Sequence, residues 1–326
     1  MHTKFITRSL LAAILLFSLV LSACSQAAPP AAETSPEPAT LKIAVLPILD
    51  TLPMYVAQQE GLFAKHRVQV TFIPVGSAAE RDQVINAGQA DGMINEIIST
   101  QFYNRDKIQV QIVRFAQTAT SNSAMFRILA SGKSDISSVD QLKGEPIGIS
   151  QGTVIEYLTD RLLKAQGFSK DEIQTIAVPK ISDRMALLGS GELKAAMLPE
   201  PLSSLAEQQG ARVILDDTSK PEYSYSTIAF RKAVIDQHPE AIRAFLAAIE
   251  DATNLINQDP AKFSNLLSEQ NLVPAPLSGS FPVPKFATAG IPTQAQWDDV
   301  LEWAKENGLL SKDVSFQDSV TASFLP

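Results

Sequence analysis

Cysteine and histidine are scarce in this sequence: its 326 residues include one cysteine and three histidines. A single cysteine excludes an intramolecular disulfide. The histidines are His2, His66 and His238, and no Cys/His spacing of a zinc site exists. Neither His66 nor His238 neighbours a convincing nucleophile or acid. We therefore expect no metal, no cofactor and no catalytic residue.

Positive charge and long apolar runs are also limited. The formal net charge is −8, from 27 basic and 35 acidic side chains. Nucleic-acid binding depends on cationic contacts to phosphate, so this balance argues against a nucleic-acid partner. Beyond the N-terminal run at 10–21 no long apolar segment follows, and the body of the protein is therefore not expected to span a bilayer.

The N-terminus has the three parts of a secretory signal. Lys4 and Arg8 precede the apolar run at 10–21, which is too short for a spanning helix. The tetrapeptide "LSAC" at 21–24 resembles a bacterial lipobox, so we expect residues 1–23 to be a signal peptide and Cys24 to be a lipid anchor. The alternative is an ordinary signal peptide with an accidental cysteine. Cleavage before Cys24 removes two basic residues and no acid, which lowers the charge from −8 to −10.

The segment after Cys24, "SQAAPPAAETSPEPAT", contains no large apolar side chain and four prolines. Such a segment cannot bury enough surface to fold, and its prolines favour an extended, stiff conformation. We expect residues 24–40 to be a tether that holds a folded body away from a membrane. The predicted location is extracytoplasmic, at the bacterial cell membrane.

The body, residues 41–326, is long enough to favour two lobes over one core. Short β-rich runs alternate with helical stretches, which predicts an α/β fold with mostly parallel sheets. The expected helices are 53–65, 77–87, 153–166, 182–190, 200–209, stretches within 232–270, and 293–308. The expected strands are 41–46, 68–75, 91–95, 109–116, 125–131, 146–150, 175–179, 195–198, 212–216 and 226–230.

Two segments share a pattern: "AGQADGMINE" at 87–96 and "SGELKAAMLPE" at 190–200. Each has a glycine that ends a helix, a short apolar strand with a methionine, and then a glutamate. Ligands of open α/β sheets bind at the carboxyl ends of strands. We therefore expect the loops that begin at Asn95 and Pro199 to face each other across a cleft.

Several stretches resemble the extracytoplasmic substrate-binding proteins of ABC importers. "LPMYVAQQEGLFAKHRVQVTF" (52–72), "INAGQADGM" (85–93) and "SVDQLKGEPIGISQGT" (138–153) are similar to the branch that includes nitrate, taurine and alkanesulfonate binders and the NMT1/THI5-like thiamine-pyrimidine group. "SGELKAAMLPEPLSSLAEQQGARVI" (190–214) and "HPEAIRAFLAAIEDATNLINQDP" (238–260) follow in the same order.

This resemblance implies a type II periplasmic-binding-protein fold with a hinged cleft. Lobe 1 would combine 41–127 with 226–326, lobe 2 would span 128–225, and the hinge crossovers would lie near 129–132 and 219–226. It also implies a monomeric binding protein that delivers a small molecule to a permease and ATPase. The alternative of another class is a THI5-like pyrimidine-synthesis enzyme, against which the export signal and the histidine positions argue.

The candidate ligand-binding residues lie in loops at strand ends. Asp50 and Thr51 stand before a helix that they could equally cap, and Gly152 and Thr153 open a helix whose free N–H groups favour an anion or a polar oxygen. Glu200 could accept hydrogen bonds from a ligand or favour a helix start. The remaining candidates are Asn95, Glu96, Gln117, Thr118, Ser150 and Pro199, with Tyr55, Tyr157, Tyr223 and Tyr225 as rings that could stack on a planar ligand.

The charges of these loops bear on the ligand. They contain Asp50, Glu96 and Glu200 but no lysine or arginine, which favours a neutral or amine-bearing planar molecule over a bare anion. Within the family, this points to a thiamine-pyrimidine-like or flavin-like vitamin. An alkanesulfonate, taurine or nitrate ligand is the alternative, since Arg127 or Arg184 could supply a cation to the cleft.

Overall fold

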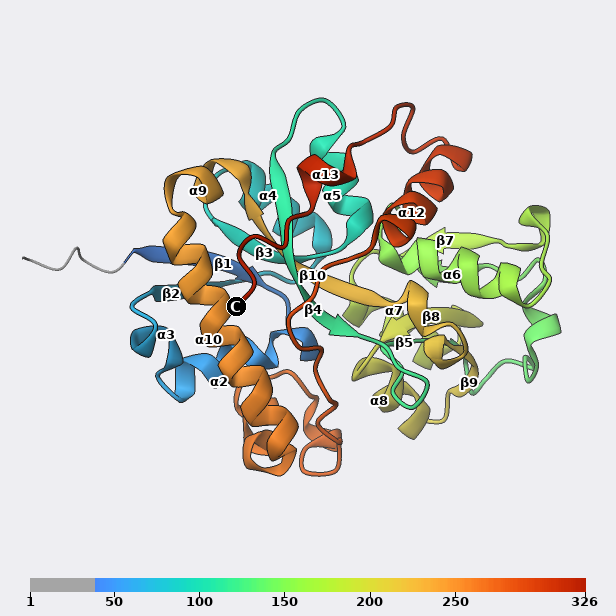
Figure 1. Ribbon diagram of the computed structural model, residues 1–326. Helices are drawn as coiled ribbons and strands as arrows, with labels where there is room; N and C mark the ends of the chain where they lie inside the picture. The colour runs from blue at the N-terminus through green and yellow to red at the C-terminus, as the bar shows by residue number, and fades with distance from the viewer. Residues whose placement is uncertain (1–38) are drawn as a thin grey trace, which may run out of the picture. The chain divides into compact units, whose positions relative to one another are not determined.

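Two five-stranded sheets organise the chain (Figure 1). In the first, the strand order is β2-β1-β3-β10-β4, with β1 parallel to β2 and β3, and β10 antiparallel to β3 and β4. Every residue of β3 is buried, as expected for a central strand. The strands of this sheet are β1 (Thr40–Val45), β2 (Gln69–Pro74), β3 (Gly92–Asn95), β4 (Val110–Thr118) and β10 (Tyr225–Arg231).

The second sheet repeats this plan with the order β7-β6-β8-β5-β9. Here β6 is parallel to β7 and β8, and β5 is antiparallel to β8 and β9. Each sheet thus has one reversed strand, and the predicted α/β fold with mostly parallel sheets is confirmed. The strands are β5 (Phe126–Ala130), β6 (Ile147–Ile149), β7 (Thr175–Ala177), β8 (Ala195–Pro199) and β9 (Arg212–Asp216).

The computed structural model describes residues 39–326. The predicted signal peptide, the Cys24 anchor and almost all of the tether lie outside the described residues. Within residues 39–326, no helix combines the length and apolar character needed to cross a bilayer.

Most connecting helices lie where the hydrophobic periodicity predicts them, with two differences. The expected helix 53–65 is divided at Gly61, whose φ of +67° is left-handed and begins a separate turn. Helix α5 was not predicted: four of its eight residues are polar, yet seven of the eight are buried, so its polar side does not face solvent as in an ordinary amphipathic helix. The helices between strands are α2 (Leu52–Gln59), α3 (Leu62–Lys65), α4 (Ala78–Asn86), α5 (Ile97–Asn104), α6 (Val154–Ala165), α7 (Ile181–Ser190) and α8 (Leu202–Gln208).

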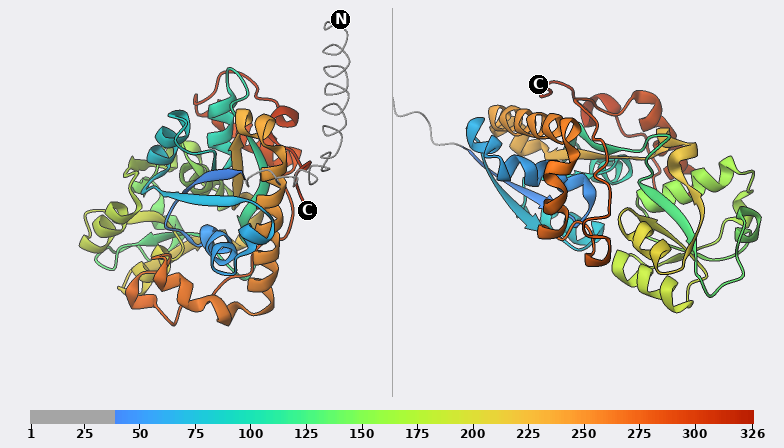
Figure 2. Two further views of the ribbon diagram at one scale, coloured as in Figure 1. Left: turned by 90° about the vertical axis from the view of Figure 1, so that its left-hand side faces the viewer. Right: turned by 90° about the horizontal axis from the view of Figure 1, so that it is seen from below.

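After β10 the chain is helical, as predicted. The 20-residue helix α10 begins at Pro239 and packs its apolar side against the first sheet (Figures 1 and 2). These helices are α9 (Lys232–Gln237), α10 (Pro239–Gln258), α11 (Ser264–Glu269), α12 (Gln294–Glu306) and α13 (Phe316–Ser319). The 3₁₀ turns are η1 (Leu49–Thr51), η2 (Val139–Leu142), η3 (Lys170–Glu172), η4 (Asp217–Ser219), η5 (Pro221–Tyr223), η6 (Pro260–Phe263) and η7 (Ala275–Leu277).

Helix α12 joins the parts of the molecule built on the two sheets. Thr293 caps it, and Trp297 and Trp303 are buried on its apolar side. Asp299 of this helix forms an ion pair of 3.0 Å with Nη2 of Arg161 on α6 and accepts a hydrogen bond from the Tyr157 hydroxyl. The apolar core that contains α12 accordingly runs from the first sheet into the second.

The chain crosses between the sheets twice, over residues 119–125 and again over residues 217–224. The first crossover was expected at 129–132, but Leu129 and Ala130 are already paired within β5 of the second sheet. The carboxylate of Asp217, fully buried in the second crossover, accepts hydrogen bonds from the N–H groups of Met125 and Phe126 at 3.0–3.2 Å. This carboxylate therefore ties the two crossovers together.

The titration of Asp217 should appear in the pH dependence of stability. Burial raises its pKa from 3.8 to about 6. The folded protein therefore binds a proton between these values that the unfolded chain does not. Its contribution to the free energy of unfolding then increases as the pH falls from about 7 to about 4, by up to about 1.4 kcal/mol per pH unit.

Asp217→Asn removes this titration, because an amide does not ionise. Urea unfolding at pH 7 and pH 4.5 should show that wild type gains stability relative to the variant at the lower pH. Asp106→Asn, at a side chain that is 73% exposed, serves as the control. A wild-type-to-variant difference that is the same at both pH values would contradict the assignment.

Candidate functional site

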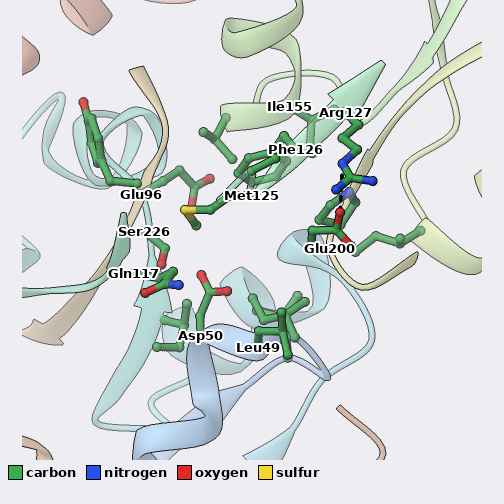
Figure 3. Close-up of a pocket in the computed structure, with 18 of the residues that line it drawn as sticks. Leu49, Asp50, Glu96, Gln117, Met125, Phe126, Arg127, Ile155, Glu200 and Ser226 are labelled. Carbon is green, nitrogen blue, oxygen red and sulfur yellow. Dashed lines mark ion pairs between the residues drawn. The ribbon is translucent and has the colours of Figure 1, made fainter. Parts of the chain in front are cut away.

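A cavity of about 760 Å³ lies where the carboxyl edges of the two sheets meet (Figure 3). Residues that follow β1, β2, β3, β6, β7 and β8 line it, together with the first residues of the reversed strands β5 and β10. Its volume is in the range of small-molecule sites, roughly 300–1,000 Å³. Much of the wall is apolar, with Leu49, Met125, Phe126 and Ile155 among the lining side chains.

The structure brings most of the predicted site residues to this one cavity. The loops after Met93 and Met197 both line it, so the expectation that they face a shared cleft is confirmed. The predicted residues that line the cavity are Asp50, Asn95, Glu96, Gln117, Ser150, Thr153, Pro199, Glu200 and Tyr225.

Six predicted residues do not line this cavity: Thr51, Tyr55, Thr118, Gly152, Tyr157 and Tyr223. The Thr51 side chain is fully buried and donates to Ile48 O at 2.7 Å, so it does not cap α2 either. Tyr55 packs edge-on against Phe72, with 5.0 Å between ring centroids. The Tyr157 ring packs against Trp303 and Tyr223.

Two carboxamides at the cavity have a definite orientation. Thr100 Oγ1 donates to Glu96 O, so it must accept from Asn95 Nδ2 at 2.9 Å. Gln117 Nε2 donates to the carbonyl oxygen of Lys285 at 3.4 Å. Each amide nitrogen thereby donates one hydrogen bond within the protein, and Asn95 Oδ1 and Gln117 Oε1 remain buried without a donor among the described residues.

Asp50 completes this acceptor surface, beside Gln117 and Ser226 (Figure 3). Burial raises its pKa, while the Ser226 hydroxyl acts in the opposite direction. Within residues 39–326 no cation pairs with it at 4.0 Å or less. We call the side-chain oxygens of Asp50, Asn95 and Gln117 the acceptor wall. Buried acceptors without donors, here Asn95 Oδ1 and Gln117 Oε1, are costly, so this wall suits a ligand with N–H or O–H groups.

The cleft also contains cations, which the loop residues alone did not reveal. Arg81, Arg127, Arg184 and Lys285 line the cavity. The sequence left open a cation from Arg127 or Arg184, and the structure places both at the cavity. Helix α4 and the segment before Phe286 add Arg81 and Lys285, which the sequence did not single out.

Two of the predicted acidic residues are already paired with these cations. Glu96 Oε2 lies 2.9 Å from Arg81 Nη1, and Glu96 Oε1 accepts from the Ser99 hydroxyl at 2.6 Å. Glu200 Oε1 lies 3.0 Å from Arg127 Nε. Glu200 Oε2 also accepts from Ser204 N at 3.3 Å, which agrees with its expected role at a helix start.

The start of α6 has fewer free N–H groups than expected. Thr153 is its N-cap and accepts from Ile155 N at 3.2 Å. Gly152 N donates to Glu156 Oε2 at 2.6 Å, so a carboxylate of the protein already occupies this position. The predicted preference of this loop for an anion is weakened accordingly.

The segment 281–285 forms a wall that the sequence did not reveal. Phe281, Pro282, Pro284 and Lys285 line the cavity, although this proline-rich stretch lies far along the chain from every other lining residue. The carboxamide of Asn257 on α10 holds its end, since Nδ2 donates to Phe286 O and Oδ1 accepts from Phe286 N, both at 2.9 Å.

The positions of two cavity arginines have a signal in the sequence. Arg81 and Arg184 each lie on the helix that follows a predicted strand, at 68–75 and 175–179, so the strand-end rule places the first turns of those helices at the cleft. Among the described residues, no group of three or more His, Cys, Asp and Glu side chains is gathered as metal ligands.

The buried pair of Glu96 and Arg81 leads to a test of its role. Both side chains are under 10% exposed, and without the Glu96 charge the buried Arg81 keeps only Asp82, which is 36% exposed and lies 2.9 Å from Arg81 Nε. Glu96→Gln should lower the free energy of unfolding by about 3 kcal/mol. Urea unfolding measures this, with the exposed Glu302→Gln on α12 as the control. A loss within about 0.5 kcal/mol would mean that the pair does not support the fold.

Two such sheets with a cleft at their carboxyl edges define the periplasmic-binding-protein fold. The alkanesulfonate-binding protein SsuA from Xanthomonas axonopodis pv. citri, bound to MOPS, matches with a TM-score of 0.73 at 19% identity, over 87% of this chain and 99% of that chain. The desulfurization enzyme DszB has the same fold, with a TM-score of 0.68 at 14% identity over 88% and 97% of the two chains.

The family described as NMT1/THI5 like matches residues 49–263, more than half of the chain. The chain belongs to this family. A Haemophilus influenzae protein provisionally named for thiamine biosynthesis is 24% identical over 65% of this chain and 66% of its own length. A Brachyspira hyodysenteriae protein provisionally named as an ABC transporter periplasmic binding protein is 21% identical over 74% of each chain.

Proposed function

We propose that this protein is the extracytoplasmic solute-binding component of an ABC importer and that it captures a small organic nutrient in the cleft. The observation that carries this proposal is the cavity of about 760 Å³ between two sheets of a family member, with mostly apolar walls and a few buried polar groups. A permease and an ATPase would receive the bound molecule. The relative named as an ABC transporter binding protein supports this role.

Hinge closure would trap the ligand. We propose that one lobe is built on the first sheet and the other on the second, with the boundaries near 127 and 226 that the family resemblance implies. Two crossovers joined by one buried carboxylate are a short, ordered connection about which two lobes can rotate. Residues from both sheets line the cavity, so rotation would change its width.

The favoured ligand is a planar, amine-bearing organic molecule, such as a thiamine-pyrimidine-like or flavin-like vitamin. The acceptor wall supports this choice, because Asn95 and Gln117 offer buried oxygens without donors and Asp50 adds a carboxylate beside them. Met125 and Phe126 offer apolar surface to a ring. A nitrate ion would leave most of such a volume unfilled. An alkanesulfonate is the alternative, and the structural match to SsuA supports it.

Ligand binding can be tested by thermal denaturation of purified protein with a panel of compounds. The panel is 4-amino-5-hydroxymethyl-2-methylpyrimidine, riboflavin, taurine, MOPS and nitrate. A ligand at 100 times its Kd should add about 2.7 kcal/mol to the free energy of unfolding. We expect an aminopyrimidine or flavin to raise the melting temperature, and Asp50→Asn to weaken that compound at least about 10-fold.

Other outcomes of the panel separate the alternatives. A shift with MOPS or taurine alone would identify a sulfonate binder. If no compound shifts the transition while one of them is chemically converted, the THI5-like enzyme would replace the binding-protein proposal.

We further propose that lipid on Cys24 anchors the protein at the cell membrane. Cys24→Ser removes the sulfur that would carry the lipid. It should move the protein from the membrane fraction of expressing bacteria to the soluble fraction, as seen by immunoblot. Affinity for the panel compound that binds should not change. Continued membrane association of the variant would disprove the anchor.

A further inference from the structure

Arg184 is a buried cation at the cleft. It lies on α7, its side chain has no exposed surface, and it lines the cavity. Nε donates to Met197 O at 2.8 Å and Nη1 donates to Val178 O at 2.7 Å. Nη2, which carries two N–H donors, is buried and has no hydrogen-bond partner among residues 39–326.

Two other arginines of the described chain, Arg81 and Arg114, are equally buried, and each has an acidic partner. Arg81 pairs with Glu96 at 2.9 Å, and Arg114 Nη2 lies 2.6 Å from Glu250 Oε2. Within residues 39–326 no carboxylate lies within 4.0 Å of Arg184. Burial lowers the pKa of Arg184 to about 10, which still leaves the guanidinium charged at neutral pH. A buried charge without a counter-ion is costly, and two carbonyl oxygens do not neutralise it.

The position of this guanidinium is built into the second sheet. Val178 directly follows β7 and Met197 is the middle residue of β8, so the two carbonyls fix the guanidinium between these strands, and Arg184 lines the cavity. On β6, Gly148 leaves space for the arginine stem. A Cβ there would lie 3.4 Å from Arg184 Cγ and 2.6 Å from a Leu193 methyl. The guanidinium is therefore held by both its stem and its hydrogen bonds.

We propose that Arg184 is a subsite for an anionic group of the ligand, supplied as a phosphate monoester, sulfonate or carboxylate. This rests on the proposed binding function and refines it. The acceptor wall of the first sheet accepts hydrogen bonds from N–H groups of the ligand, and Arg184 of the second sheet binds the ligand's anionic group. The ligand is then a bipolar organic molecule that contacts both sheets, and its anion supplies the charge that Arg184 lacks.

A purely structural role for Arg184 makes a different prediction. An arginine that only joined the ends of β7 and β8 would, when replaced, weaken all ligands equally. If Arg184 contacts the anionic group directly, its replacement weakens binding only of ligands that carry this group. Matched pairs of compounds distinguish these cases, with and without the negative group.

The experiment measures Kd by isothermal titration for three pairs: riboflavin and riboflavin 5′-phosphate, 4-amino-5-hydroxymethyl-2-methylpyrimidine and its phosphate ester, and 3-morpholinopropanol and MOPS. Wild type should bind the anionic member of at least one pair about 10-fold to 100-fold more tightly than the neutral member, as expected for a charged hydrogen bond. Arg184→Met should abolish this preference, and Arg184→Lys should retain part of it. Arg105→Met, an exposed residue outside the cavity, removes the same charge and should leave the preference unchanged.

The wild-type comparison keeps the proposal testable even if Arg184→Met does not fold. A neutral member that binds as well as its anionic partner would overturn the Arg184 subsite and leave the proposed function standing. Equal weakening of both members by Arg184→Met would show a structural role and also overturn it. If neither member of any pair binds wild type, the subsite and the favoured ligand class are both wrong.

Discussion

The architecture depends on the chain crossing twice between two sheets. Each crossing leads into a reversed strand, β5 on the way out and β10 on the way back. A reversed strand begins at the edge where its parallel neighbours end. Phe126 and Tyr225 therefore stand at the same edges as the loops after β8 and β3. The Asp217 carboxylate and the hydrogen bond from Ala119 N to Ser224 O hold the two crossings together.

The electrostatics of the cleft follow from which charges find partners inside the protein. Glu96 and Glu200 pair with Arg81 and Arg127, so these four side chains largely neutralise one another. The polar groups that remain free to bind a ligand differ between the two sheets. The first sheet offers the buried oxygens of Asn95 and Gln117, whereas the second offers Nη2 of Arg184, which has neither a hydrogen-bond partner nor an acidic partner among residues 39–326. Such separation of acceptors and donors on opposite walls gives a ligand an orientation as well as a place to bind.

Much of this structure could be predicted from local sequence. Strand and helix alternation predicted all ten strands to within a few residues, because each buried strand is a short apolar run with its own turn signals. The repeated glycine, methionine and glutamate pattern correctly placed Asn95 and Pro199 on one cleft. The limits of this approach show at α5, where polar and apolar residues are buried together, and at the first crossover, where Leu129 and Ala130 still belong to β5.

By itself, the sequence determined the α/β class, the order of the elements and the edge at which a ligand site forms, because these depend on periodicity and on strand direction. Only the tertiary structure decided which side chains reach that edge and which of them remain unpaired. The Tyr157 hydroxyl donates to Asp299, and Tyr157 does not line the cavity. Glu96 is paired with Arg81. Segment 281–285, which is distant in sequence, lines the cavity. The physical reason is that charge pairing and burial depend on neighbours in space, and these neighbours are set by packing rather than by local sequence.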